Sequence, residues 1–310
     1  MQEKKNRRRF VLLVLLTLLT LIAFWWIQPE NRLDIDQEIF MVEDLSVISR
    51  VELVSGAGKV SLRFDGSYWR VNDEYRADGD MIRVLFATLQ QARPKRAVAN
   101  VYQDSIYQSL AASGVSVSLY AGEELRKQFL TGGNAAKTQA FFADPASEDV
   151  YVMSIPGYRV YVSGILELPE SGWRDKFVFG FNWRNFKSLE AEYPASPRDN
   201  FTVSSDRNHF GIMGLSQADT ARLNTFLDEI SLLRVDEYLS EPELTDSLLR
   251  ETPRMEIRVS DIGNRLYRLR LYDPGRSTDF LGIIQDSQPA RFDRRKIALL
   301  LQPKSFFIKK

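Results

Sequence analysis

The chain has 310 residues, 44% of them hydrophobic and 26% charged, so it can form more than one hydrophobic core and lies far from the composition of disordered proteins. Its 41 basic and 41 acidic residues cancel, and the basic excess is concentrated in the first nine residues, which argues against a surface that follows nucleic-acid phosphates. Cysteine is absent, which excludes disulfides, a thiolate nucleophile, a lipid-modified cysteine and a cysteine-ligated metal.

The amino terminus carries an uncharged apolar run from Phe10 to Ile27, which as a helix would extend about 27 Å and match a bilayer core. We predict a transmembrane helix over residues 10–27. Residues 1–9 form a basic tail that the positive-inside rule keeps in the cytoplasm, and Trp25 and Trp26 fall at the opposite interface. A cleaved signal peptide is the alternative, but the sequence WWIQPE offers no small-residue cleavage site. The prediction is a single-pass protein of the bacterial inner membrane with a periplasmic main domain.

A spacer is predicted over residues 28–45, because this stretch contains Pro29, several acidic residues and only one short apolar patch. Three β-favouring segments separated by turn residues follow, and we expect an antiparallel meander from them: 47–54, 59–64 and 68–72. A helix should begin after Ala77-Asp78, since the next apolar residues recur at helical spacing: Ile82, Leu85, Phe86 and Leu89.

The same pattern recurs 141 residues later, which indicates an internal duplication. Trp69 corresponds to Phe210, Ala77-Asp78 to Ala218-Asp219, and the helical stripe to Leu223, Phe226, Leu227 and Ile230. Residues 160–173 resemble 294–307 in turn, and the strands expected at 115–120 and 126–131 correspond to those at 255–259 and 266–272.

We therefore expect an α+β fold in which the transmembrane helix is followed by a duplicated unit, each copy an antiparallel β-meander with packing helices and a closing helix. The predicted boundaries are 46–187 for the first α+β unit and 188–310 for the second.

Motifs that would carry catalysis are missing, and we assign no catalytic, cofactor-binding or metal-binding residue. The single histidine, His209, has no second histidine or cysteine to join it, so a surface position is expected. Gly56-Ala57-Gly58-Lys59 departs from a phosphate-binding loop and is interpreted as a hairpin turn. The acids Glu74, Asp78 and Asp80 are interpreted as helix-capping residues.

The densest aromatic patch lies in FVFGFNW, where alternation would place Phe177, Phe179, Phe181 and Trp183 on one face of a strand. We expect this face to belong to the core, with an exposed surface for a glycan or a partner as the alternative. Trp173-Arg174-Asp175 is interpreted as a local turn with an ion pair. The candidates for an interaction site are Trp173, Phe179, Phe181 and Trp183.

Several of these segments together resemble the bacterial domain-of-unknown-function 4340 family. The residues that carry the resemblance are Trp69, Ala77-Asp78, Gly132-Gly133, Tyr151-Val152 and Arg174-Asp175. The resemblance implies membrane-anchored envelope proteins, similar to auxiliary components of ABC transporters and of gliding motility, with no established reaction.

The resulting hypothesis is a non-catalytic accessory or scaffold protein of an envelope complex, in contact with the bilayer and with a membrane-protein partner, for which ABC transporter subunits are one candidate. An extracytoplasmic module that binds a glycan or a peptide is the second hypothesis. A hydrolase that works with carboxylates alone is the third.

Overall fold

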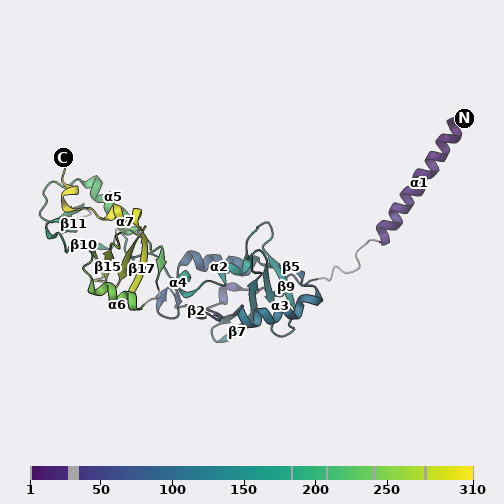
Figure 1. Cartoon of the computed structure of the whole chain (residues 1–310), viewed down its shortest axis with the longest axis horizontal. Coiled ribbons are helices and arrows are strands. Elements are labelled where there is room, and N and C mark those ends of the chain that lie inside the picture. Colours follow the sequence, from purple (N-terminus) through teal and green to yellow (C-terminus); the bar gives the residue numbers. More distant parts are fainter. Residues whose placement is uncertain are drawn as a thin grey trace. The chain divides into compact units, whose positions relative to one another are not determined.

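The computed structural model describes residues 2–26, 35–182, 184–206, 209–239, 242–275 and 278–309, with the side chains of 6–22 in the first range. The fold is α+β, with two large antiparallel sheets and several helices (Figure 1). Part of the predicted transmembrane segment and spacer, residues 27–34, lies outside the described residues, as does Trp183.

The first sheet contains nine strands in the order β4-β3-β2-β1-β6-β7-β8-β9-β5. Its strands are β1 (Arg50–Ser55), β2 (Gly58–Phe64), β3 (Trp69–Val71), β4 (Tyr75–Arg76), β5 (Arg93–Ala97), β6 (Val115–Ala121), β7 (Glu124–Gly133), β8 (Ala140–Ala143) and β9 (Val150–Ser154). The predicted meander is confirmed, and Gly56 to Gly58 form the expected turn, in which Gly58 has a φ of 127°.

The second sheet contains eight strands in the order β12-β11-β10-β14-β15-β16-β17-β13. Its strands are β10 (Phe186–Glu192), β11 (Phe201–Asp206), β12 (His209–Ile212), β13 (Glu237–Tyr238), β14 (Met255–Asp261), β15 (Leu266–Tyr272), β16 (Asp279–Ile284) and β17 (Gln288–Asp293). Read from β3 and from β12, the two sheets have the same strand order, and β4 is an additional edge strand of the first.

The described residues also form helices and 3₁₀ turns. The helices are α1 (Gln2–Trp26), α2 (Gly79–Gln91), α3 (Asn100–Ser113), α4 (Glu170–Trp173), α5 (Thr220–Ser231), α6 (Pro242–Arg250) and α7 (Arg294–Leu300), with 3₁₀ turns η1 (Leu45–Val47), η2 (Val162–Ile165), η3 (Pro197–Asp199) and η4 (Lys304–Phe307). The predicted helical stripes are buried, with Leu85 in α2 and Leu223 and Leu227 in α5 fully inaccessible.

Equivalent hydrogen bonds occur in the two copies. The Asp78 amide donates to the Trp173 carbonyl, and the Asp219 amide donates to the Phe307 carbonyl, each at 2.8 Å. One residue further along the closing segment, isolated bridges join Ala77 to Arg174 and Ala218 to Ile308. The two sequence likenesses, that of the helix starts and that of residues 160–173 to 294–307, therefore describe one recurring three-dimensional arrangement. In each copy the closing segment, which ends at Trp173 or Phe307, is fixed beside the start of α2 or α5.

The closing helices are shorter than predicted. In the first copy, residues 160–173 form only the 3₁₀ turn η2 and the single turn α4, because Gly164, Pro169 and Gly172 interrupt any longer helix. In the second copy, α7 is longer, and a 3₁₀ turn follows it.

By its contacts the chain divides into two compact units. Unit 1 comprises residues 1–48, 53–56 and 86–166, and unit 2 comprises 49–52, 57–85 and 167–310. The core of unit 2 includes inward residues of the second sheet and the apolar faces of α5 and α7. In unit 1, Leu110 of α3 lies in a cluster with Phe141, Val150 and Val152.

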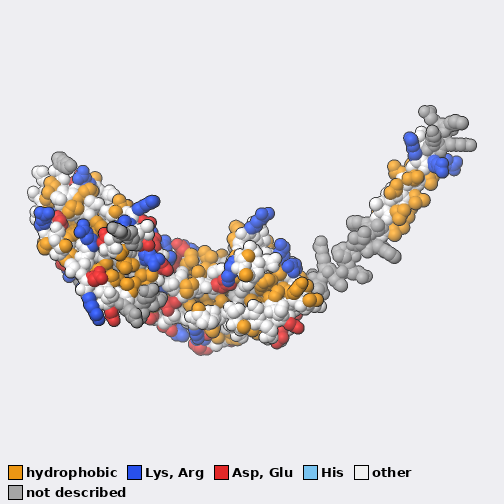
Figure 2. Space-filling view, in the orientation of Figure 1, with side chains coloured by type: hydrophobic (Ala, Val, Ile, Leu, Met, Phe, Trp, Pro, Cys, Tyr) orange, Lys and Arg blue, Asp and Glu red, His pale blue; other side chains and the backbone are white. Residues whose placement is uncertain are grey.

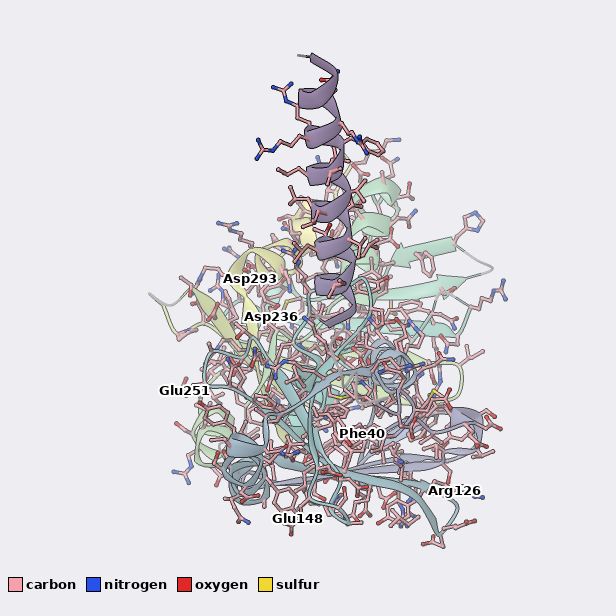
Figure 3. The ribbon with its side chains drawn as sticks, turned by 90° about the vertical axis from the view of Figure 1, so that its right-hand side faces the viewer. Phe40, Arg126, Glu148, Asp236, Glu251 and Asp293 are labelled. Atoms are coloured by element: carbon pink, nitrogen blue, oxygen red, sulfur yellow. The ribbon has the colours of Figure 1, made fainter. Side chains whose placement is uncertain are left out.

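The described part of the predicted spacer is fixed to unit 1 by one ring. Phe40, which is labelled in Figure 3, is 5% exposed. It lies edge-on to the rings of Phe129, Phe142 and Tyr151, with ring centroids 5.5–5.8 Å apart. Edge-to-face aromatic pairs of this kind are favourable beyond the area that they bury. The segment before β1 is thus part of the packed structure from Phe40 onwards.

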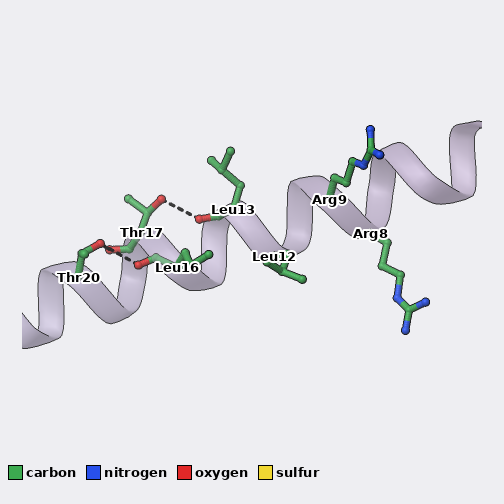
Figure 4. Close-up of a pocket in the computed structure, with 7 residues that line it drawn as sticks. All are labelled: Arg8, Arg9, Leu12, Leu13, Leu16, Thr17 and Thr20. Atoms are coloured by element: carbon green, nitrogen blue, oxygen red, sulfur yellow. Dashed lines mark hydrogen bonds between the residues drawn. The ribbon is translucent and has the colours of Figure 1, made fainter.

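Helix α1 exposes its apolar side chains all along its described part, from Phe10 to Ile22 (Figure 2). The hydroxyls of Thr17 and Thr20 donate to the carbonyls of Leu13 and Leu16, so these polar groups are satisfied within the helix (Figure 4). Within the described residues, no helix is both long enough and apolar enough to span a bilayer.

Candidate functional site: a hollow at the start of α2

Unit 2 contains a hollow of about 580 Å³ between β3, the first turn of α2, the segment 175–182 and the end of α5. Its apolar lining is largely aromatic: Phe64, Tyr68, Trp69, Phe177, Phe179 and Phe181. Phe64 and Phe177 are 42% and 43% exposed, so an apolar group in the hollow would contact both rings. A concave surface with an apolar floor is the usual form of a binding site.

Asp78 fixes the start of α2 at the edge of the hollow. Its carboxylate accepts from the Asp80 amide at 2.8 Å, as the sequence predicted for a capping residue, and its carbonyl accepts from the Ile82 amide. Its second carboxylate oxygen lies 2.9 Å from Nη2 of Arg234. The equivalent Asp219 caps its own helix through the Arg222 amide, so only the first copy uses this carboxylate to hold a distant arginine.

Two further ion pairs lie at the rim. Nε of Arg76 is 3.7 Å from the Asp175 carboxylate, and Arg83 pairs with Asp80 one turn away on α2. Every carboxylate that lines the hollow within the described residues thus has an arginine partner.

Arg174 directly precedes Asp175 of the rim and is held between two aromatic rings. Its guanidinium lies between the rings of Tyr75 and Tyr238, 3.7 and 3.8 Å from their centroids, and Nη2 donates to Gln288 at 2.7 Å. The residue is only 8% exposed, so stacking on both faces compensates for the loss of water.

Tyr238 links this stack to the rim, because its hydroxyl donates to the Asp175 carbonyl at 2.8 Å. Burial raises the pKa of the Tyr238 hydroxyl to about 12, although the charge of Arg174 acts in the opposite direction. Burial likewise raises the pKa of Tyr75. Both hydroxyls therefore remain protonated at neutral pH.

The candidate interaction residues from the sequence are core residues where the structure describes them. Trp173 is fully buried, Phe179 is 1% exposed and Phe181 is 8% exposed, so the core interpretation of this aromatic run is confirmed for these two phenylalanines. Trp183 lies outside the described residues. Phe177, which was expected on the same buried face, is 43% exposed, so the core interpretation is wrong for this residue. The binding hypothesis for a glycan or peptide stays a prediction.

The predicted strand through these residues is wrong. Phe177 forms one isolated bridge, to Arg234, and residues 178–182 form no ladder. Side chains satisfy the backbone instead: the Tyr267 hydroxyl donates to the Gly180 carbonyl, and the Asn182 side chain accepts from the amides of Arg184 and Asn185.

Sequence reasoning singled out part of the lining of the hollow, including Asp78, Phe179 and Phe181, but it did not predict that these residues meet at one site. Arg234, Tyr75 and Tyr238 carry no local motif, and Arg174 was interpreted only as part of a turn. The sequence signal that exists is the pair Ala77-Asp78 together with Arg174-Asp175, since the bridge from Ala77 to Arg174 brings both dipeptides to one place. No group of three or more metal-ligating side chains occurs among the residues that the structure describes. His209 lies exposed at the start of β12.

A family model matches residues 69–252, and its description is domain of unknown function (DUF4340). The chain belongs to this family. The match covers more than half of the chain, including β3, α2, the first sheet from β5 onwards and every lining residue of the hollow except Phe64, Ser67 and Tyr68. Neither the curated proteins nor the solved structures contain a significant match to the chain.

The dipeptides on which the family resemblance was based have structural roles. Trp69 belongs to β3, and Tyr151 contacts Phe40. At Gly133 a side chain is excluded, because a Cβ atom there would lie 2.3 Å from the hydroxyl oxygen of Tyr161 and 2.7 Å from the Gln139 carbonyl. These positions preserve the packing of the fold.

Proposed function

We propose that this protein is a membrane-anchored, extracytoplasmic accessory or scaffold subunit of an envelope complex, and that it carries out no reaction itself. The observation that carries the proposal is the composition of the hollow. Its floor is aromatic, two of its rings are exposed, and each carboxylate in it is neutralised by an arginine of the same unit. Such a surface suits an apolar side chain of a partner protein better than a charged substrate.

The anchor is supported by the sequence of α1. The apolar run from Phe10 to Ile27 extends beyond the described side chains of this helix, and five basic residues precede it. All of its described large apolar side chains are exposed, and burying them in lipid would be strongly favourable. We therefore propose a bacterial inner-membrane protein with a cytoplasmic amino terminus and a periplasmic main domain, so that its partner is a membrane protein.

The anchor can be tested with two variants of the full-length protein in its native membrane. Leu15→Arg/Leu16→Arg should release the chain from carbonate-washed membranes, because each central arginine costs about 2.5–3.5 kcal/mol of insertion free energy. Leu15→Ile/Leu16→Ile keeps the helix apolar and should remain in the membrane. Release of both variants, or of neither, would overturn the anchor.

The partner can be tested by placing a photo-crosslinking residue at Arg83, on the rim of the hollow, and at Arg295, an exposed position on α7. After purification in mild detergent, mass spectrometry should identify a membrane protein, such as an ABC transporter subunit, attached at residue 83 and absent at residue 295. A chain that purifies alone, or adducts of equal yield at both positions, would argue against an accessory subunit that docks through the hollow.

A further inference from the structure

A cluster of cations lies in unit 1, on the edge strand β5 and on the loop that follows β9. Lys95 and Arg96 are exposed on β5, and Arg159 is exposed on the loop. Among the described residues, no acidic side chain lies within ion-pair distance of any of the three, whereas the arginines of the hollow are all paired. Unpaired cations on one surface attract an anionic partner.

Exposed apolar side chains flank Arg159. Tyr158 is 65% exposed and Val160 is 53% exposed, at the end of a turn that Gly157 makes possible with a φ of 82°. The antiparallel register pairs Arg93 with Ser154, so the loop begins beside the start of β5. Lys95, Arg96, Tyr158, Arg159 and Val160 are called the β5 patch below, and Figure 2 shows blue side chains near β5 and β9 of Figure 1.

The amino-terminal segment is fixed close to this patch. Phe40 contacts the ring of Tyr151, and Tyr151 is the strand partner of Ala97, which adjoins Arg96. Even when fully extended, the chain from Ile27 to Phe40 could span at most about 45 Å. A membrane that holds residues 10–27 therefore lies within reach of the edge of unit 1 that carries the β5 patch.

We propose that the β5 patch binds the surface of the bilayer, with its cations on anionic phospholipid headgroups and Tyr158 and Val160 at the acyl boundary. The proposal rests on the proposed membrane anchor. An interfacial site typically combines basic residues with aromatic and aliphatic side chains. Each cation near an anionic surface adds roughly a fivefold gain in partitioning. The acids Asp36, Asp144 and Asp149 lie close enough to Tyr151 to raise its pKa, after the larger effect of its burial.

The test uses the full-length protein in lipid nanodiscs, labelled at one site with a polarity-sensitive dye through Tyr158→Cys; the chain has no other cysteine. In discs that contain phosphatidylglycerol, the emission should shift to the blue and a lipid-borne quencher should reduce it at least twofold. Discs of phosphatidylcholine alone, or high salt, should abolish both effects. The same emission in both kinds of disc would overturn the proposal.

The cations of the edge strand β5 could also serve only to keep that edge polar, and two variants distinguish this role from attraction to lipid. Lys95→Gln/Arg96→Gln/Arg159→Gln keeps the edge polar and should lose the quenching while retaining its melting temperature, and Arg126→Glu, an exposed cation elsewhere in unit 1, should retain the quenching. A glutamine variant that quenches normally would refute a role for these charges.

Failure of the anchor would be visible separately, as a chain that does not elute with the discs. In that case the same proteins would be sedimented with vesicles. The proposal for the β5 patch would still be supported if the wild type bound phosphatidylglycerol vesicles, if salt reversed this binding, and if the glutamine variant did not bind. Equal sedimentation with phosphatidylglycerol and phosphatidylcholine vesicles, or no sedimentation with either, would overturn it.

Discussion

Nη2 of Arg234 lies 2.9 Å from Oδ2 of Asp78, although 156 positions separate the two residues in the chain. The Asp78 side chain is only 10% exposed and also caps α2, so this one carboxylate orders both the helix start and the far wall of the hollow. Its counterpart Asp219 contributes the cap but pairs with an arginine on its own helix.

Asp78→Ala should lower the free energy of unfolding by about 1–2 kcal/mol, because α2 loses its cap and Arg234 loses its partner. Combined with Arg234→Gln, it should give a coupling energy of about 0.5–1 kcal/mol in urea unfolding of the full-length protein in detergent.

The control cycle pairs Asp219→Ala with Arg234→Gln. These effects should add within about 0.5 kcal/mol, since the two residues share no partner. Additive effects in both cycles would show that the Asp78–Arg234 contact contributes nothing to stability.

The raised pKa of Tyr238 gives a prediction for alkaline pH. The folded pKa of about 12 exceeds the usual value of 10.0, so the folded state holds this proton more tightly than the unfolded state. The stability that results is complete below pH 10 and is lost as the pH rises from 10 to 12, with a limit on the order of 3 kcal/mol.

The measurement is tyrosinate absorbance against pH for the wild type and for Tyr238→Phe. The difference should titrate near pH 12, and stability in the variant should decline less between pH 10 and 12. A difference that titrates near pH 10 would contradict the burial argument. Arg174 favours the ionised form, so Arg174→Met should move this titration further upward.

Gly133 leaves no room for a side chain, and Gly133→Ala should destabilise the protein by about 1–3 kcal/mol because Tyr161 or the Gln139 backbone must move. Gly211 is the matched control, since it also lies within a strand but has no atom within 4 Å of the position that a Cβ atom would take, so Gly211→Ala should change the melting temperature little. Equal melting temperatures for the two variants would contradict the steric explanation.

Phe40→Ala should cost about 3–5 kcal/mol, because it removes a buried ring from contact with three others. Limited proteolysis should then cleave within 35–48 faster than in the wild type. Ile39→Ala, at a partly exposed neighbour, should leave that cleavage rate nearly unchanged. If both variants resist the protease as the wild type does, Phe40 does not fasten this segment.

Local pattern was sufficient to predict much of the fold. The correspondence between the two copies placed β14 and β15 within two residues of their observed bounds. The helical stripes of α2 and α5 were correct, since burial of one face leaves a periodic signal. The helix α3 gives a weaker signal, because Leu110 is its only fully buried residue among those that the structure describes, and it was not predicted.

The hollow could not be predicted, because its parts meet only in three dimensions. The stack on Arg174 needs Tyr75 from β4 and Tyr238 from β13, and neither has a distinctive neighbourhood in the sequence. The run that starts at Phe177 misled the alternation rule, since residues 178–182 follow an irregular path without a ladder, on which the consecutive residues Val178 and Phe179 are both buried.

The recurring bond from the early helix to the closing segment has a consequence for biosynthesis. The amide of Asp219 cannot reach its acceptor until Phe307 has been synthesised, long after the helix that Asp219 caps. The second copy therefore cannot form this bond until Phe307 has emerged, whereas the first copy can form its own once Trp173 has emerged. A chain interrupted before Phe307 would consequently lack the bond that fixes the closing segment of the second copy, while the first copy could already have folded.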